Sequence, residues 1–363
     1  MRIILLAGAR PNLIKVAPLL SAFERAGITA DVAFTGAREW GSSTEDPTRL
    51  SFWGVTIQAP RWFLDIAEGT SAFETGTALV AVEKLLAAER PDAVLAVGDH
   101  NATLAFAIAA AKQRIPIAHL EAGLRCGDLG VPEEVNRVLI SRVTALHLAC
   151  DEASMAHLMG EGVDPDRIVL VGSVLAESVI RNGESVRDLN VAARYGLERG
   201  GYVTGSLHCA ENLEDPTRCQ AIFDGLAALG LPFLLPDAHG ASGALETFGI
   251  RVGGSVRIVE AVPYPEMLAL LRDAAVIVTD SGGVQEEACM LGTPCVTVRR
   301  CTERAATIVV GANRLADASS DAIVSAARDA IEGPRKWLTP KRWDKAVSQR
   351  VVRTLRRGVP PLE

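Results

Sequence analysis

The sequence predicts an α/β protein made of two doubly wound, Rossmann-like domains. Short β-branched runs alternate with longer Ala- and Leu-rich stretches of helical period, and this alternation occurs twice along the 363 residues. The expected strands are continuous apolar runs, which is typical of a parallel sheet covered by helices on both faces. A charged stretch over 181–199 separates the two series and is expected to contain the crossover.

The first series opens with an apolar run that we expect to be a buried strand. Strands are predicted over 3–7, 30–35, 93–97 and 117–120, with helices over 12–25, 77–88 and 102–112. The opening run is too short to span a bilayer. Its charges at Arg10 and Lys15 follow the apolar residues, the reverse of the order in a signal peptide. We therefore expect a cytoplasmic protein with no membrane partner.

The second series repeats the pattern. Strands are predicted over 201–206, 233–235, 256–258, 275–279 and 296–298, with helices over 216–229, 265–272 and 285–291. A basic amphipathic helix is expected over 341–357, either packed back on the first domain or solvated. The predicted division is an N-terminal domain over 1–178, a C-terminal domain over 179–340, and a last segment over 341–363 that returns to the first domain.

Charge and cysteine content exclude several classes of protein. A net charge of −7 argues against a nucleic-acid partner, although one nucleotide in a local basic pocket is compatible with it. The seven cysteines are widely spaced and contain no CxxC, which favours reduced thiols over a disulfide framework or a zinc knuckle.

The segment 280–287 follows a predicted strand and opens a predicted helix. Gly282 and Gly283 would let the backbone approach a ligand, and free N–H groups at a helix start hold phosphate. Ser281 could add a hydroxyl, and Glu287 could accept from ribose hydroxyls. The alternative is a glycine turn with Asp280 as the N-cap. The sequence contains no GxxxxGK[ST], and no GxGxxG follows the first strand, so P-loop and nicotinamide sites are not expected.

Cations and a histidine follow other predicted strands. Arg10 and Lys15 suit a diphosphate, or they are surface cations of little effect. His208 could serve as an acid or base, or it is an ordinary loop or capping histidine. Cys209 beside it is a weak candidate nucleophile, because sequence neighbours rarely form a nucleophile–base pair. A metal site from His100, His119 and Glu121 lacks metal-ligand spacing, so we expect no metal.

Acidic residues gather between positions 98 and 137. Asp99 and Glu121 stand at or near strand ends, and Glu133 and Glu134 begin a predicted helix. Carboxylates in one cleft acquire separate pKa values and can divide acid and base roles. Asp99 could instead cap a helix, and the two glutamates could be ordinary first-turn acids.

Together these segments resemble the UDP-N-acetylglucosamine 2-epimerase family, which has the GT-B fold of two Rossmann-like domains with the active site in the cleft between them. The chain carries, in the family's order, GARPNLIKVAP, GDHNATL, HLEAGLR, PEEVNR, LHCAEN, DSGGVQEE and TERA. The resemblance spans nearly the whole chain and implies a cofactor-free reaction in a homodimer. A proton leaves C2 of the UDP-sugar, UDP departs to leave a 2-acetamidoglucal, and UDP returns as C2 is protonated on the opposite face.

The resemblance also implies roles for individual residues. Asp99, Glu121, Glu133 and His208 match the catalytic positions. Ten further residues match UDP-sugar contacts or positions close to them: Arg10, Lys15, Arg137, Met267, Ser281, Gly282, Gly283, Glu287, Thr302 and Arg304. The sequence does not assign the C2 base among the carboxylates.

The chain departs from the family pattern at three loops. Cys209 replaces an arginine, Ala37 and Arg38 fall where a Gln-His pair is usual, and Ala238 falls in a segment usually basic. We expect activation by a second UDP-GlcNAc to be weakened or lost, and a modified substrate from a specialised pathway is compatible with these changes. Three alternatives remain open: a hydrolysing epimerase that releases ManNAc and UDP, a GT-B glycosyltransferase, and a non-catalytic binding protein.

Overall fold

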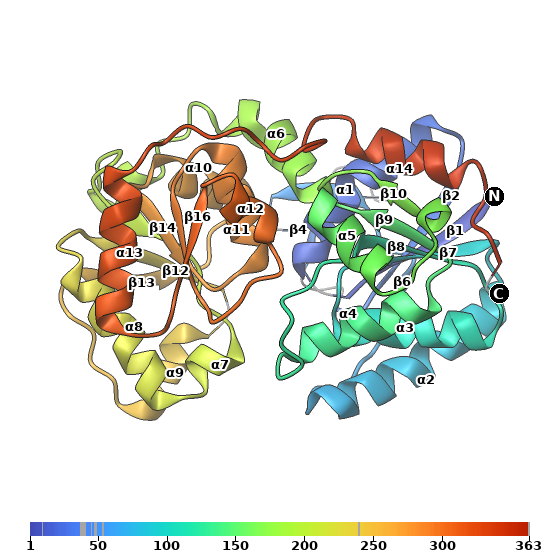
Figure 1. Ribbon diagram of the computed structural model, residues 1–363, viewed down its shortest axis with the longest axis horizontal. Helices are drawn as coiled ribbons and strands as arrows, with labels where there is room; N and C mark the ends of the chain where they lie inside the picture. Colours follow the sequence, from blue (N-terminus) through green and yellow to red (C-terminus); the bar gives the residue numbers. More distant parts are fainter. Residues whose placement is uncertain are drawn as a thin grey trace. The chain divides into compact units, whose positions relative to one another are not determined.

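The computed structural model describes residues 1–8, 10–36, 41–44, 46, 49–52, 54–238 and 240–361, without the side chains of Arg10, Pro11 and Ser43 (Figure 1). The chain divides into two compact units. Unit 1 comprises Met1–Ser178 and Lys341–Glu363, and unit 2 comprises Val179–Pro340.

Unit 1 contains a seven-stranded sheet in the order β10-β9-β8-β7-β1-β2-β6. All of its strand pairs are parallel. The strands are β1 (Arg2–Ala7), β2 (Thr29–Phe34), β6 (Trp62–Phe63), β7 (Ala93–Val97), β8 (Ile117–Ala122), β9 (Leu146–Ala149) and β10 (Ile168–Leu170). The helices are α1 (Arg10–Arg25), α2 (Ser71–Glu89), α3 (Asn101–Lys112), α4 (Pro132–Val143), α5 (Glu152–Gly160), the start of α6 (Val174–Val186), and α14 (Val347–Leu355).

Alternate side chains of β1 enter two different cores, one on each face of the sheet. Ile3 and Leu5 pack with α1 and α14, whereas Ile4 and Leu6 pack with α2 and α3. A strand covered on both faces must be apolar at every position, and this explains the unbroken run that opens the sequence.

A small antiparallel sheet was missed by the sequence prediction. It consists of β3 (Ser42–Ser43), β4 (Arg49–Phe52) and β5 (Val55–Gln58). Leu50, Phe52 and Ile57 add one apolar face to the core beside α1, and polar residues between them face outward. Strands this short carry too few alternating positions to be recognised from the sequence.

Unit 2 contains a six-stranded parallel sheet in the order β13-β12-β11-β14-β15-β16. The strands are β11 (Val203–Thr204), β12 (Phe233–Asp237), β13 (Val256–Glu260), β14 (Val276–Thr279), β15 (Cys295–Val298) and β16 (Asn313–Ala316). The helices are α7 (Ala210–Leu213), α8 (Pro216–Ala228), α9 (Ala241–Phe248), α10 (Tyr264–Asp273), α11 (Gly282–Leu291), α12 (Ala305–Val309) and α13 (Ser320–Glu332). The two sheets confirm the predicted doubly wound α/β class.

The predicted helix over 341–357 was too long, because only Val347–Leu355 is helical. The segment before it is a turn in which the indole of Trp343 donates to the Cys150 carbonyl at 3.0 Å. Asp344 accepts from the Ala346 N–H, and its carboxylate also pairs with Arg350. None of the helices in the described part of the chain is both long and apolar enough to cross a membrane.

Candidate active site

In unit 1, the strand order changes direction between β1 and β7. The chain continues from β1 to β2 on one side and from β7 to β8 on the other, so the loops after β1 and β7 separate and leave a crevice. Gly8 lies in the loop after β1, and Gly98 and Asp99 begin the loop after β7. A pocket of about 430 Å³ opens at this edge, and its lining includes Gly8, Thr35, His100 and Asn101.

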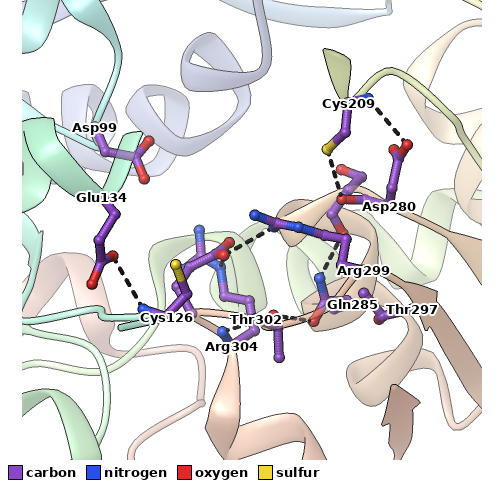
Figure 2. A network of polar contacts seen from close by, with 12 residues as sticks. Asp99, Cys126, Glu134, Cys209, Asp280, Gln285, Thr297, Arg299, Thr302 and Arg304 are labelled. Atoms are coloured by element: carbon purple, nitrogen blue, oxygen red, sulfur yellow. Dashed lines mark hydrogen bonds and ion pairs between the residues drawn. The ribbon is translucent and has the colours of Figure 1, made fainter. Parts of the chain in front are cut away.

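Asp99, which is partly exposed, belongs to an ion-pair network whose other members, Arg137 and Glu134, are buried. Nη1 of Arg137 lies 2.6 Å from Asp99 Oδ2, and Nε of the same guanidinium donates to Glu134 Oε2 at 2.8 Å. Glu134 also accepts from the backbone N–H of Cys126 (Figure 2) and from that of Gly127. Burial opposes ionisation of Glu134, but these hydrogen bonds and the charge of Arg137 lower its pKa below the ordinary value.

A second set of hydrogen bonds holds the backbone of Asp99. The amide of Asn136 donates to the Asp99 carbonyl at 2.8 Å and to Asn101 Oδ1 at 3.1 Å. Asn101 in turn donates to Glu74 Oε2 at 2.8 Å. Asn136 and Arg137, the last two residues of the PEEVNR motif, therefore both hold the loop after β7 from helix α4.

Glu121 lies in an unusual backbone conformation. Its φ of +66° falls in the left-handed region, and the pairing of β8 with β9 shifts register between Leu120 and Ala122. Lys15 Nζ lies 2.8 Å from Glu121 Oε2, and both side chains are buried. A non-glycine residue held at positive φ on a bulged strand end is a feature that clusters at functional sites.

His119 on β8 holds the loop after β7 through a hydrogen bond to Gly98. Its Nε2 lies 2.9 Å from the Gly98 carbonyl, at a glycine whose φ of +72° favours the absence of a side chain. Burial lowers the pKa of His119 to about 4, so the imidazole is neutral at physiological pH and donates this hydrogen bond. The sequence offered His119 only as a doubtful metal ligand, and its support of Gly98 was not predicted.

The two glutamates of α4 lie in different environments. Glu133, the predicted catalytic residue, is exposed in the first turn, whereas Glu134 is 2 % exposed. Sequence reasoning missed Glu134 as the partner of Arg137. The i,i+3 spacing of these two residues was the available signal, but the sequence does not show which face of the helix turns inward.

In unit 2, the strand order changes direction between β11 and β14, and the loops after both strands carry predicted residues. Gly205, directly after β11, packs closely on β14, because a Cβ at this position would lie 1.8 Å from the Val278 carbonyl oxygen. β11 covers only Val203–Thr204, so it is shorter than the predicted strand over 201–206.

Asp280 holds the His208 loop. Its carboxylate accepts from the backbone N–H of His208 at 2.9 Å and from Asn212 Nδ2 at 3.1 Å. It also accepts from the backbone N–H of Cys209 at 3.0 Å (Figure 2). His208 Nδ1 lies 3.3 Å from Asp280 Oδ1, and the His208 side chain is about one-third exposed, at 35 %. Asp280 is therefore the residue that orients His208, and the N-cap of α11 is Ser281 rather than Asp280.

The start of α11 packs on a buried polar cluster. A Cβ on Gly282 would lie 2.3 Å from Glu303 Oε1, so a larger residue would require the Glu303 carboxylate to move. Thr302 Oγ1 donates to Gln285 Oε1 at 2.7 Å, and Arg304 Nη1 lies 2.5 Å from Glu286 Oε1. Thr302 and Arg304 are buried among these partners.

The remaining predicted contacts in unit 2 lie on two neighbouring helices. Glu287 on α11 is buried, and Met267 on α10 is half-buried. Tyr264 is also buried, and this burial, together with the charge of Glu287, raises its pKa well above the ordinary value. The phenol therefore stays protonated beside the Glu287 carboxylate.

Several sequence-based predictions lie outside the described residues. They are the side chain of Arg10 and the positions of Ala37 and Arg38. Ala238 is described, and the Asp237 carboxylate before it accepts from the Gly240 and Ala241 N–H groups.

Known proteins match this chain over nearly its full length. A family model described as UDP-N-acetylglucosamine 2-epimerase matches residues 24–356. The UDP-N-acetylglucosamine 2-epimerase of Methanocaldococcus jannaschii is 32% identical over 369 residues, with 99% of this chain and 100% of the relative covered. The UDP-2,3-diacetamido-2,3-dideoxy-D-glucuronate 2-epimerase of Pseudomonas aeruginosa is 35% identical over 338 residues, with 91% and 92% covered.

Solved structures give the same result. The crystal structure of the Methanocaldococcus jannaschii enzyme in complex with UDP-GlcNAc and UDP matches with a TM-score of 0.89 at 31% identity, covering 99% of this chain and 100% of that one. A Streptomyces glycosyltransferase matches with a TM-score of 0.50 at 17% identity over 98% and 99% of the two chains, which shows the shared fold alone and fits the two-domain GT-B class. The chain therefore belongs to the UDP-N-acetylglucosamine 2-epimerase family and is an epimerase.

Proposed function

We propose that this epimerase is non-hydrolysing and interconverts UDP-GlcNAc and UDP-ManNAc. The observation that carries the proposal is the placement of chemical groups at the two points where strand order changes direction. Unit 1 presents Asp99 and Glu121 there, each held by a buried cation. Unit 2 presents His208 and the helix start at Gly282 there.

The carboxylates of unit 1 would remove the proton from C2 of the sugar and return one to it. That proton is poorly acidic, and its return to the opposite face needs a group on each side of the sugar. Asp99, Glu121 and Glu133 are the proposed set. The ion pairs of Arg137 with Asp99 and of Lys15 with Glu121 hold two of these carboxylates in fixed positions, which proton transfer requires.

The groups of unit 2 would bind UDP and stabilise it as it leaves. Backbone N–H groups at the start of α11, at Gly282 and Gly283, can hold a diphosphate, and His208 can add a hydrogen-bond donor. Glu287 and Met267 would contact the nucleoside. Thr302 donates a hydrogen bond to Gln285 and Arg304 forms an ion pair with Glu286, so we propose that they shape the start of α11.

We further propose that the acidic pocket beside the loop after β7 receives the sugar, and that it favours UDP-GlcNAc over a uronate sugar. Asp65, Glu68 and Glu74 line it, and none of the described residues lining it is Lys or Arg. A glucuronate, which the name of the Pseudomonas aeruginosa relative implies as its substrate, would bring another carboxylate toward these three. Like charges at short range disfavour each other, so a neutral sugar suits this pocket better.

Proton exchange at C2 tests the proposal. The protein would be incubated with UDP-GlcNAc in deuterated water and followed by NMR. Deuterium at C2 with UDP-ManNAc formation is expected. Free ManNAc with UDP would instead show hydrolysis, and no exchange and no UDP release without an acceptor would favour a glycosyltransferase or a binding protein. The uronate analogue, assayed in parallel, should react more slowly than UDP-GlcNAc.

A further inference from the structure

We propose that His208, Cys209 and Asp280 form a binding site for a thiophilic divalent cation of the zinc class. Within the described part of the chain, these three residues bring one nitrogen, one sulfur and one oxygen ligand atom within 4.8 Å of one another. Zinc prefers this mixture of donors, whereas magnesium and calcium prefer oxygen alone.

Asp280 is the most firmly held of the three proposed ligands. The residue is fully buried, and hydrogen bonds from the His208 and Cys209 backbones and from Asn212 hold its carboxylate. Oδ1 accepts one backbone hydrogen bond and faces the imidazole Nδ1 at 3.3 Å. A carboxylate oxygen has capacity for more than one partner, so Oδ1 can meet a cation without losing the hydrogen bond that orders the loop.

Cys209 supplies the group that selects a soft metal. Its thiol donates to the Asp280 carbonyl at 3.4 Å, and the side chain is half-buried, so it is ordered and reachable (Figure 2). Cysteine binds zinc as the thiolate, so binding would release this proton to solvent. Ligand atoms around tetrahedral zinc lie about 3.5 Å apart, so the cluster needs only a small contraction.

Three protein ligands would leave one tetrahedral position for a water or an added group. A cation bound here would coordinate the His208 imidazole and so prevent it from taking part in the proposed catalysis. The expected consequence, which rests on the proposed function, is reversible inhibition of the epimerase by zinc.

Cadmium gives a direct test that does not depend on turnover, because a cadmium–thiolate bond absorbs in the ultraviolet. The full chain, treated with chelator and then dialysed, would be titrated with Cd²⁺ alone. We expect one thiolate band per chain, displaced by Zn²⁺ and lost in Cys209→Ser. Cys126→Ser and Cys301→Ser are matched controls, because these are the other thiols that are not buried, and both should keep the band.

His208→Gln and Asp280→Asn test the other two ligands. Each should weaken cadmium binding by at least about tenfold. Because Asp280 is buried, circular dichroism would check that Asp280→Asn still folds. His208 is an exposed loop residue, so His208→Gln removes a ligand without disturbing the core. A band that survives in Cys209→Ser, or no band in the unaltered chain, would overturn the site.

Activity is a separate measurement. If zinc inhibits the unaltered enzyme and chelator restores it, Cys209→Arg should resist inhibition. Cadmium binding without any effect on turnover would keep the metal site and contradict the role of His208, so the two proposals fail differently.

Discussion

A single guanidinium, that of Arg137, joins the carboxylates of Asp99 and Glu134, at 2.6 Å from the first and 2.8 Å from the second. The side chains of Arg137 and Glu134 are 3% and 2% exposed. Removing a buried cation leaves its partners uncompensated, which is more costly than removing the whole set.

Arg137→Met should therefore lower the free energy of unfolding by about 3 kcal/mol. Adding Glu134→Gln to this variant should restore part of the loss, because the orphaned charge is gone. Urea unfolding of both single variants and the double variant forms the cycle that measures this coupling. Strict additivity of the two changes would contradict the network.

Glu133→Gln and Glu134→Gln should separate chemistry from stability. Glu133 is exposed and proposed to be catalytic, so its amide should reduce kcat by about 10²-fold or more and leave the urea midpoint unchanged. Glu134 holds two backbone N–H groups and Arg137, so its amide should lower the urea midpoint. Steady-state kinetics and urea unfolding of the two isosteric variants check this. Unchanged kcat in Glu133→Gln would remove Glu133 from the catalytic set.

Stability should fall in mild acid because of buried histidines. Burial lowers the pKa of His119 to about 4 and that of His147 to about 3, both below the unfolded value near 6.5. The unfolded chain therefore takes up protons first, so the stabilisation is complete above pH 6.5 and is lost as pH falls toward 4.

His119→Gln removes one of these groups and can keep a donor to the Gly98 carbonyl. For one histidine shifted this far, the loss between pH 6.5 and 4 is roughly 3 kcal/mol. Urea unfolding at several pH values should show a shallower decline for His119→Gln than for the unaltered chain. Parallel declines would contradict the burial effect.

Gly205 and Gly243 should respond oppositely to alanine. A Cβ on Gly205 would meet the Val278 carbonyl oxygen at 1.8 Å, so Gly205→Ala should destabilise unit 2 by about 3 kcal/mol. Gly243 lies within α9 with nothing within 4 Å of an added Cβ, so Gly243→Ala should stabilise by about 0.5 to 1 kcal/mol. Thermal unfolding of the two variants measures both signs.

The strand ends could be predicted because a parallel sheet turns sequence order into spatial order. Asp99, His208 and Ser281 all follow apolar runs, and in the structure they follow β7, β11 and β14 in the order expected. The motifs that resemble the family, GDHNATL, LHCAEN and DSGGVQEE, contain these three residues.

Features that depend on side-chain direction could not be predicted. The sequence places Glu133 and Glu134 side by side, and only the packing of α4 shows that Glu134 turns inward. The cap of α11 fell to Ser281 because Asp280 is held by the His208 loop, a contact between residues about 70 positions apart (|i−j| of 72). The turn at 341–346 depends on the hydrogen bond from Trp343 to the Cys150 carbonyl, which lies even farther away in sequence (|i−j| of 193).

The return of the C-terminal segment reverses the order in which the two units can mature during synthesis. Val347, Val351 and Leu355 close the same core as Leu13 and Phe23, so unit 1 lacks part of its interior until the end of the chain leaves the ribosome. Unit 2 is one continuous stretch and holds all of its own strands. The unit translated second is thus the first that can finish folding, and a premature stop after residue 340 would release a complete unit 2 tethered to an unfinished unit 1 with apolar surface exposed.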